Sequence, residues 1–348
     1  MHPSDLILAK VLSALETTPY ACTDLIPLSG GYVNFVYRGI LASPIATTQP
    51  TTRVIVKHAE PYIAANSDWK SSVTRIQYEA LMLKAMKVLP PTKVQYVTTT
   101  SPILSSQLQV YLSTPELDTN EVSNVGVSLG RWMSRFHEWG AMPDQASLRR
   151  EIKGYHEMAE MKYNITYGSL RESIARYPAL FGSSTHVFVR LKQRLKTEVA
   201  GTEDQLVHGD FGCRNVLISD GSLSVGRRTL SLSIIDWEVS HLGSVAIDLG
   251  QMLAELYVLT HFHSVTVASG MITQFIIGYG QLKDELAFRV ALEFGVNLVL
   301  WPCREPSIRD EPLTERCVHL GKDMIVHAEE KDKLWFRDGV LDSIFIFA

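Results

Sequence analysis

The pattern of apolar residues changes near residue 116, and this change limits the folds that the chain can adopt. Before it, short runs of β-branched and aromatic residues alternate with turns, and TTRVIVKHAEP (residues 51–61) is typical of a strand. After it, apolar residues recur at helical spacing, first over residues 122–139 and then almost continuously over 245–328. We therefore predict a bilobal α+β fold. Residues 1–115 form a small antiparallel β-sheet lobe with one main helix, and residues 116–348 form a larger, mostly helical lobe.

The same patterns predict the individual elements of the first lobe. An amphipathic helix is expected over residues 1–18, and a second helix over 67–89, which Ser67 or Asp68 can cap and Pro90 stops. Strands are expected at the remaining β-like runs, at residues 24–27, 35–41, 51–58, 94–100 and 108–114. Two short β-like runs, 216–219 and 230–236, interrupt the second lobe.

Composition excludes several classes of protein. Of the 348 residues, 46% are hydrophobic and 20% charged, the net charge is −4, and no block of lysine and arginine occurs. This balance argues against nucleic acid or an anionic membrane as the main partner. The longest apolar stretches are interrupted before membrane-spanning length. The four cysteines form no Cys-x-x-Cys pair, and the N-terminus lacks a secretory pattern. We expect a cytoplasmic monomer or homodimer.

Three features of the first lobe suit a nucleotide. LSGGYVNFVYR (residues 28–38) places glycines between β-like runs, where the backbone of Ser29, Gly30 and Gly31, with Asn34, can approach a phosphate. Lys57 ends a strand, and Glu79 lies beside the apolar face of the next helix, where its carboxylate needs a partner such as Lys57. Taken singly, these features also fit a hairpin turn, an edge-strand lysine and a solvated glutamate.

Two segments of the second lobe carry the chemistry. HGDFGCRNVLI (residues 208–218) supplies Asp210 and Asn215, and SIIDWE (233–238) supplies Asp236 and Glu238 after a short strand. With the three earlier features, their order matches the signature set of protein kinases. Phosphoryl transfer explains the residue types. Lys57 would hold the nucleotide phosphates and Glu79 would fix Lys57. Asn215 and Asp236 would hold Mg²⁺, and Asp210 would accept the proton of the acceptor hydroxyl.

Departures from the protein-kinase pattern point to a small acceptor. The catalytic segment reads His-Gly-Asp and lacks the usual arginine, and the metal motif reads Asp-Trp-Glu. No Ala-Pro-Glu follows, and residues 236–257 run almost directly into a helix. This leaves no room for a regulatory activation loop or a peptide platform.

Over about residues 25–305 the chain resembles the aminoglycoside phosphotransferase / choline kinase family. The residues that match the family pattern are His208, Asp210, Asn215, Ile235, Asp236, Trp237, Glu238, Asp248, Leu249 and Gly250. The resemblance implies ATP and Mg²⁺ as cofactors and Asp210 as the base. It also implies Asn215 and Asp236 as metal ligands, with Glu238 assisting the metal or contacting the acceptor. By the same resemblance Asp248 braces the catalytic loop and His208 orders it, both as structural residues.

The resemblance also implies a nucleotide hinge over residues 110–114, which would bring Tyr111 and Ser113 to the nucleotide. Within the family, the motifs look closest to a branch with methylthioribose kinase and the fungal 4-hydroxytryptamine kinase. Candidate acceptor contacts are Glu238, Tyr257, Trp301 and Arg304.

The candidate contacts imply two opposite acceptor charges. Trp301, where Trp-Pro is expected to end a helix, could stack on an acceptor, and Arg304 could pair with a carboxylate. Glu238 and Glu255 could instead attract a cationic amine. Both alternatives stay open.

We expect a kinase that phosphorylates a hydroxyl group of a small metabolite, hydroxytryptamine-like in fungal secondary metabolism, or methylthioribose-like. The alternatives are an aminoglycoside-type resistance kinase and a catalytically silent nucleotide-binding homologue. The intact set Lys57, Glu79, Asp210, Asn215 and Asp236 argues against the silent homologue.

Overall fold

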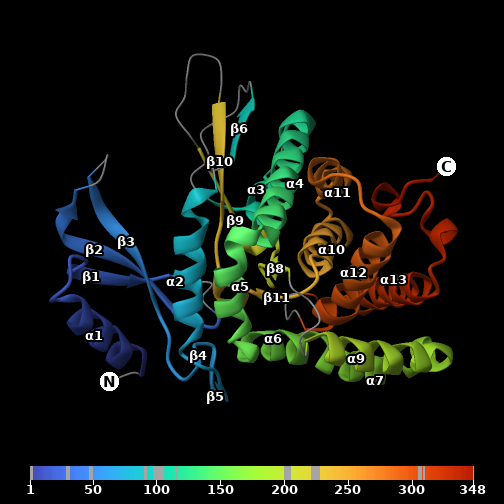
Figure 1. The fold of residues 1–348 in the computed structure, drawn as a ribbon, viewed down its shortest axis with the longest axis horizontal. Helices are drawn as coiled ribbons and strands as arrows, with labels where there is room; N and C mark the ends of the chain where they lie inside the picture. The colour runs from blue at the N-terminus through green and yellow to red at the C-terminus, as the bar shows by residue number, and fades with distance from the viewer. Residues whose placement is uncertain are drawn as a thin grey trace. The chain divides into compact units, whose positions relative to one another are not determined.

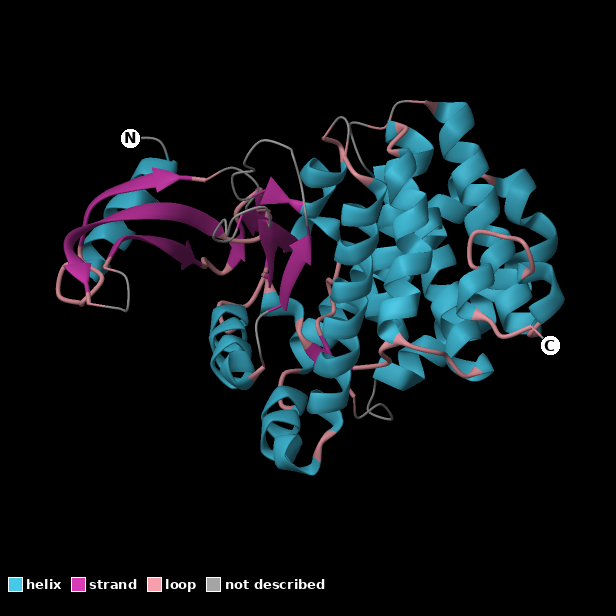
Figure 2. Cartoon of the chain, turned by 90° about the horizontal axis from the view of Figure 1, so that it is seen from above, coloured by secondary structure: helices cyan, strands magenta, loops and turns pink. Residues whose placement is uncertain are grey.

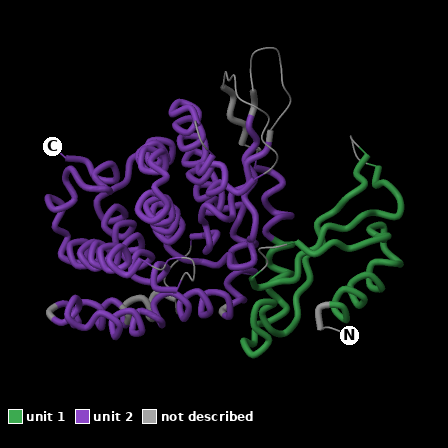
Figure 3. The backbone as a smooth tube through the Cα atoms, turned by 180° about the vertical axis from the view of Figure 1, so that it is seen from behind, with its two compact units in different colours: residues 1–81 green, residues 82–348 purple. Residues whose placement is uncertain are grey.

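The computed structural model describes residues 3–28, 32–46, 50–89, 92–96, 106–114, 117–199, 205–220, 228–304, 308 and 310–347. The chain forms two compact units, residues 1–81 and 82–348 (Figure 3). The boundary between them falls inside helix α2 (Arg75–Ala85), whereas the sequence placed the division at residue 115.

Unit 1 is built on a three-stranded antiparallel sheet. Its strands β1 (Cys22–Pro27), β2 (Phe35–Ile45) and β3 (Thr51–His58) lie in that order, and helix α1 (Pro3–Leu15) packs against them (Figure 1). Ile7 and Val11 of α1 meet Leu25 and Tyr37 of the sheet in the core of the unit. The short strands β4 (Tyr62–Ile63) and β5 (Asn66–Lys70) form a separate hairpin.

A buried arginine joins the parts of unit 1. The Arg75 side chain is fully buried at the start of α2, and its Nε donates to Asn34 Oδ1 at 2.8 Å. Its guanidinium also donates to backbone carbonyls on two other segments, including Ser72 O at 2.6 Å and Glu60 O at 3.1 Å. A charge removed from water is tolerated only when its donors are satisfied. Arg75 therefore fixes the segment around Asn34 to α2.

Unit 2 contains a four-stranded antiparallel sheet and a second short ladder. The sheet order is β6 (Thr92–Tyr96), β10 (Arg228–Ile234), β9 (Val216–Asp220) and β7 (Ser106–Gln107). Strand β8 (Leu206–Val207) pairs with β11 (His241–Leu242). These two ladders bound the segments that carry the predicted catalytic and metal residues.

Helices make up most of unit 2 (Figure 2). The long helices are α4 (Thr119–Ala141), α10 (Ala246–His263), α11 (Thr266–Tyr279), α12 (Asp284–Arg304) and α13 (Glu311–Glu330). The helices between α4 and β8 are α5 (Ala146–Lys153), α6 (His156–Tyr163), α7 (Leu170–Arg176), α8 (Pro178–Phe181) and α9 (Thr185–Val199). A π-helical turn, Asn164–Gly168, follows α6. The predicted helices over residues 1–18, 122–139 and 245–328 are thus confirmed in type.

Helix α12 differs from the sequence-based expectations in two ways. It is long and apolar enough to cross a membrane, but 78% of its apolar window is buried inside the protein, as in a core helix. The helix also continues through Pro302 to Arg304 instead of ending at Trp-Pro. Pro302 cannot donate a hydrogen bond to Leu298 O, and the Cys317 thiol of α13 contacts this carbonyl at 3.9 Å. The neighbouring helix thereby satisfies the carbonyl that proline leaves open.

Two other predicted elements were wrong. The expected helix over residues 67–89 is shorter, because residues 66–70 form β5 and α2 begins only at Arg75. The expected strand over residues 108–114 is instead helix α3 (Leu108–Leu112). Its apolar residues 108, 111 and 112 are buried at the spacing of one helical face, which a short apolar run does not distinguish from a strand.

Helices α4 and α11 pack at backbone distance. A Cβ atom on Gly130 would lie 2.0 Å from Phe275 O, and one on Gly278 would lie 2.1 Å from Val127 O. Such distances are far inside van der Waals contact, so any side chain at these positions would push the helices apart. The glycines of both helices set the spacing of this part of the core.

We predict that Gly130→Ala lowers the free energy of unfolding by about 1–3 kcal/mol, because the methyl group overpacks the contact with α11. Gly270→Ala is the matched control, since a methyl group at this α11 position would enter open space and alanine favours a helix by about 0.5–1 kcal/mol. Urea unfolding of the full chain measures both. Equal effects in the two variants would contradict the close packing.

Candidate active site

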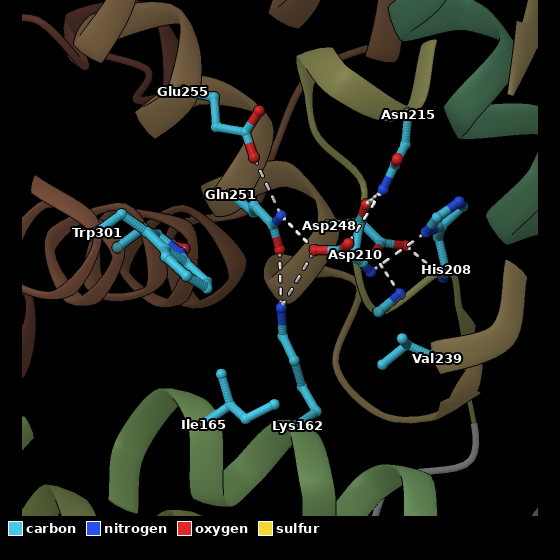
Figure 4. Close-up of polar contacts among 12 residues, drawn as sticks. Lys162, Ile165, His208, Asp210, Asn215, Val239, Asp248, Gln251, Glu255 and Trp301 are labelled. Carbon is cyan, nitrogen blue, oxygen red and sulfur yellow. Dashed lines mark hydrogen bonds and ion pairs between the residues drawn. The ribbon is translucent and has the colours of Figure 1, made fainter. Parts of the chain in front are cut away.

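The loop that carries Asp210 is held by a buried carboxylate. Asp248, in the first turn of α10, is fully buried and accepts hydrogen bonds from the backbone N–H groups of His208 (2.8 Å) and Gly209 (2.9 Å) (Figure 4). The His137 ring lies 3.1 Å from the same carboxylate. Gly209 has φ +82°, and a Cβ there would lie 2.4 Å from Val239 O, so the position requires glycine. Asp248 thus braces the loop, as the sequence predicted.

His208 orders the same loop from inside. Its Nε2 lies 2.9 Å from Ile235 O and therefore carries the proton, while Nδ1 accepts from the backbone N–H of Asp210 at 3.2 Å. The ring centroid lies 4.4 Å from that of Trp237. Because both ring nitrogens are engaged with the backbone, His208 is structural, in line with the prediction.

The surroundings of Asp248 favour its ionised form. Burial alone would raise the pKa of this carboxyl, but the hydrogen bond and charge of His137 and the backbone N–H of His208 outweigh it. The pKa of Asp248 therefore lies below its usual range. An ionised carboxylate can only accept hydrogen bonds, so the ionised form of Asp248 suits the two backbone N–H groups that point at it.

Asp210 and Asn215, which the sequence assigned to separate roles, are hydrogen-bonded to each other. Asp210 Oδ2 accepts from Asn215 Nδ2 at 3.0 Å, and the same nitrogen donates to the Asp210 carbonyl at 2.8 Å. Asp210 Oδ1 accepts from Gln251 Nε2 at 2.7 Å. The Asp210 side chain is 40% exposed, unlike the fully buried Asp248, so its carboxylate is within reach of a reactant. The arrangement fixes a reachable carboxylate in one orientation.

Three residues that sequence reasoning did not place around Asp210 surround it. Gln251 Oε1 accepts from Lys162 Nζ at 2.8 Å, and Gln251 Nε2 also donates to Glu255 Oε1 at 3.1 Å. Glu255 Oε2 accepts from the backbone N–H of Cys213 at 2.7 Å. Burial, followed by the charge of Asp210, raises the pKa of Glu255. Burial also raises the pKa of the Cys213 thiol well above its usual value.

A helical spacing could have identified two of these three residues. Asp248, Gln251 and Glu255 follow one another at i, i+3 and i+7 and therefore lie on one face of α10. The sequence singled out Asp248 and suggested Glu255 only as an amine contact. Lys162 lies in the segment 141–200, where no motif marked any position.

The segment after β10 places two carboxylates together. Asp236 has a left-handed backbone (φ 69°), and Glu238 is buried with 4% exposure. Their carboxylate oxygens lie within 4.8 Å of each other, and the Ile235 N–H bonds to Asn215 O at 2.9 Å. Since Asn215 Nδ2 donates to Asp210, Oδ1 is the side-chain atom that Asn215 could offer to a metal. Oxygen ligands of this kind suit Mg²⁺, so the residues present fit the predicted metal.

In unit 1, Lys57 and Glu79 form the predicted ion pair. Lys57 Nζ lies 2.8 Å from Glu79 Oε2, and both side chains are mostly buried. Ser29, Gly30 and Gly31 lie outside the described residues. Asn34 is buried, and its Oδ1 accepts a hydrogen bond from Arg75, so this side chain contributes to the fold of unit 1.

The predicted hinge residues contact their own unit. Tyr111 is fully buried in α3 and its hydroxyl donates to the Glu121 carboxylate. Ser113 Oγ donates to Gln109 O at 2.8 Å. The prediction assumed an extended strand, and the helix turns these side chains to internal partners instead.

The predicted acceptor residues also have internal partners. Trp301 Nε1 donates to Asn297 Oδ1 at 2.8 Å, and Arg304 Nη1 donates to Ile165 O at 2.8 Å. Tyr257 stacks on His261, with its hydroxyl 3.3 Å from the His261 Nδ1, and burial raises the pKa of Tyr257 to about 12. Tyr257, Trp301 and Arg304 thus each have a hydrogen-bond partner within the protein.

Comparison with known proteins places the chain among phosphotransferases. The model of the phosphotransferase enzyme family matches residues 105–288, a little over half of the chain. The chain is similar to the phosphotransferase FrzJ of Cladobotryum sp, with 25% identity over 99% of this chain and 98% of that protein. It is also similar to the 4-hydroxytryptamine kinase of Psilocybe cyanescens, with 24% identity over 92% of this chain and 90% of that protein.

Comparison with solved structures finds more distant likenesses. The GDP complex of an aminoglycoside 2′-phosphotransferase has a TM-score of 0.49 and 14% identity, covering 95% of this chain and 99% of that one. The Plasmodium vivax ethanolamine kinase has a TM-score of 0.49 and 13% identity, covering 95% and 91%.

We predict that Asp248→Asn lowers the free energy of unfolding at pH 7 by about 3–5 kcal/mol, because an amide presents a donor to converging N–H groups. The folded-state pKa of Asp248 lies below the unfolded value of about 3.9. Its contribution is therefore complete above about pH 4 and is lost as pH falls through the folded pKa. Urea unfolding between pH 7 and pH 3 should show the difference between wild type and variant shrinking.

Asp323→Asn is the control for this measurement, because Asp323 pairs with Lys322 near the surface of α13. We expect an effect below about 1 kcal/mol there. A difference for Asp248→Asn that stays constant with pH would show that the ionised carboxylate is not what holds the loop.

Proposed function

Because this chain belongs to the phosphotransferase enzyme family, we propose that it transfers the γ-phosphoryl group of ATP to a hydroxyl group of a small molecule. The observation that carries the proposal is the state of Asp210. Its carboxylate is reachable, and amide donors from Asn215 and Gln251 hold one oxygen each. The loop beneath it is braced by the buried Asp248.

Asp210 has the properties of a general base. Each carboxylate oxygen has further acceptor capacity after one hydrogen bond, so an acceptor hydroxyl can still donate to it. A general base needs its oxygen within about 2.6–3.2 Å of the group that gives up the proton. The two amide donors hold the carboxylate where such a contact requires no rearrangement of the loop. Asp210 would orient the hydroxyl and take its proton during transfer.

Mg²⁺ would be held by Asn215 Oδ1 and the Asp236 carboxylate, with Glu238 beside them. The ion supplies neutralisation of the phosphate charge. In unit 1, Lys57, fixed by Glu79, would contribute a positive charge to the nucleotide phosphates. This division of roles follows the residue types that phosphoryl transfer requires.

For the acceptor we propose a small hydroxylated amine of the hydroxytryptamine type. Two of the curated relatives are 4-hydroxytryptamine kinases, aligned over 92% and 79% of this chain, and this supports the proposal. Arg304 contacts Ile165 O and lies 3.7 Å from Glu172, so it is a poor candidate for an acceptor carboxylate. Glu255 is bonded to the Cys213 N–H and to Gln251, so it already serves the loop and is a poor candidate contact for an amine.

We also propose that the protein acts in the cytoplasm as a monomer or homodimer. All four cysteines, Cys22, Cys213, Cys303 and Cys317, are free thiols, which supports a reducing compartment.

We predict that MgATP-dependent ADP release occurs with a hydroxytryptamine in a panel of small hydroxyl compounds. The panel includes methylthioribose, choline, ethanolamine, homoserine and aminoglycosides, so it separates the biosynthetic, metabolic and resistance alternatives. Transfer to an aminoglycoside alone would replace the proposed acceptor. Absence of both turnover and an MgATP-dependent thermal shift would favour a silent homologue.

We predict that Asp210→Asn lowers kcat by about 10²- to 10⁴-fold, because the amide cannot accept the proton. The MgATP-dependent shift in Tm should remain, since the substitution leaves the proposed metal ligands in place. Asp236→Asn should instead reduce that thermal shift, because it removes a charged oxygen ligand. Full turnover by Asp210→Asn on the true acceptor would show that another group is the base.

A further inference from the structure

The side-chain amide of Gln251 lies between a cation and two carboxylates. Its Oε1 is 2.8 Å from Lys162 Nζ, while its Nε2 is 2.7 Å from Asp210 Oδ1 and 3.1 Å from Glu255 Oε1 (Figure 4). Gln251 is 3% exposed. We propose that Lys162 and Gln251 are positioning residues for Asp210, in which Lys162 sets the orientation of the Gln251 amide and the amide holds Asp210. This inference rests on the proposed role of Asp210 as the base.

Only one orientation of the amide satisfies its neighbours. A lysine ammonium can only donate, an ionised carboxylate can only accept, and the amide has a donor end and an acceptor end. Turned over, the amide would place its oxygen against Asp210 and Glu255, and its N–H groups against Lys162. All three contacts would then be repulsive. Lys162 therefore determines that the donor end of Gln251 faces the base.

The base needs a second donor because Asn215 alone restrains only one of its oxygens. Asn215 Nδ2 bonds to Asp210 Oδ2, and the carboxylate could still turn about this contact. Gln251 bonds to the other oxygen from α10, so the two donors together fix the plane of the group. Misplacement of a reacting group by about 1 Å can cost about 10²-fold in rate. The second donor is thus a means of holding Asp210 in line with its acceptor.

Lys162 also balances charge beside the base. Its Nζ lies 4.0 Å from Asp210 Oδ1 and the side chain is 11% exposed. Without it, Asp210 and Glu255 would share one amide as two anions, and their repulsion would press Asp210 away from Gln251. The position of Lys162 on α6, a helix well before the catalytic loop in the sequence, explains why a motif search along the chain does not reveal it.

The test compares variants that keep or remove each contact. Lys162→Met removes the cation, and we expect kcat to fall about 10- to 100-fold with the KM for ATP changed less than about threefold. Lys162→Arg keeps a cationic donor that can still face the Gln251 oxygen, so we expect most of kcat to return. Lys322→Met, at a paired lysine on α13, is the control and should keep full turnover.

Gln251→Glu tests the amide at constant shape. It replaces the donor nitrogen by an acceptor oxygen facing Asp210 and Glu255, so we expect kcat to fall at least as far as in Lys162→Met. The double variant Lys162→Met/Gln251→Leu should lose clearly less than the product of the two single losses, because Lys162 acts mainly through Gln251. Tm and its MgATP-dependent shift are measured for every variant, since a merely structural role would lower Tm and leave kcat of the folded fraction unchanged.

The outcomes separate this inference from the proposed function. If Asp210→Asn is inactive while Lys162→Met and Gln251→Glu keep wild-type kcat, the positioning role is overturned and the base assignment stands. Independent, multiplying losses in the double variant would also overturn it. If Lys162→Met does not fold, full kcat in Gln251→Glu still refutes the proposal, and a loss with Tm preserved supports it. Full turnover by Asp210→Asn would overturn the proposed function itself.

Discussion

The buried carboxylate of Asp248 is the contact on which the active-site arrangement depends. Its desolvation is offset by two backbone N–H donors and the His137 ring, which together tie α4 and the catalytic loop to α10. Because Asp248 lies in the first turn of α10, the same helix carries Gln251 and Glu255 to the loop at helical spacing. One helix therefore sets the backbone of the loop, the orientation of Asp210 and the position of the Cys213 N–H.

One pair of residues that lie apart in the sequence was predicted correctly, because the chemistry left a single sensible partner. This pair is the Lys57–Glu79 ion pair, since an unpaired carboxylate beside the apolar face of a helix would be costly. The strands over residues 51–58 and 230–234 were also recognisable, since both are rich in β-branched and apolar residues. Long amphipathic helices were predictable because their spacing repeats over several turns.

Short elements and shared partners could not be predicted in this way. The run around Tyr111 has too few residues for its spacing to separate helix from strand, and its burial is decided by what packs on it. The sequence indicated no protein partner for Trp301 or Arg304. Their partners, Asn297 and Ile165, belong to no motif and could be identified only from the structure. Lys162 was missed because its proposed role depends entirely on the side chains that it contacts, and the sequence does not show these contacts.

The Cys213 thiol gives the catalytic loop an internal reporter. The side chain is fully buried, its sulfur lies 3.8 Å from Met252 Sδ, and burial holds its pKa well above the usual value. The thiolate is the nucleophile that reacts with alkylating and oxidising reagents, so the buried, protonated Cys213 thiol is protected from both. Cys213 can be modified only when the loop separates from α10. The rate of labelling therefore measures how often the segment that holds Asp210 opens.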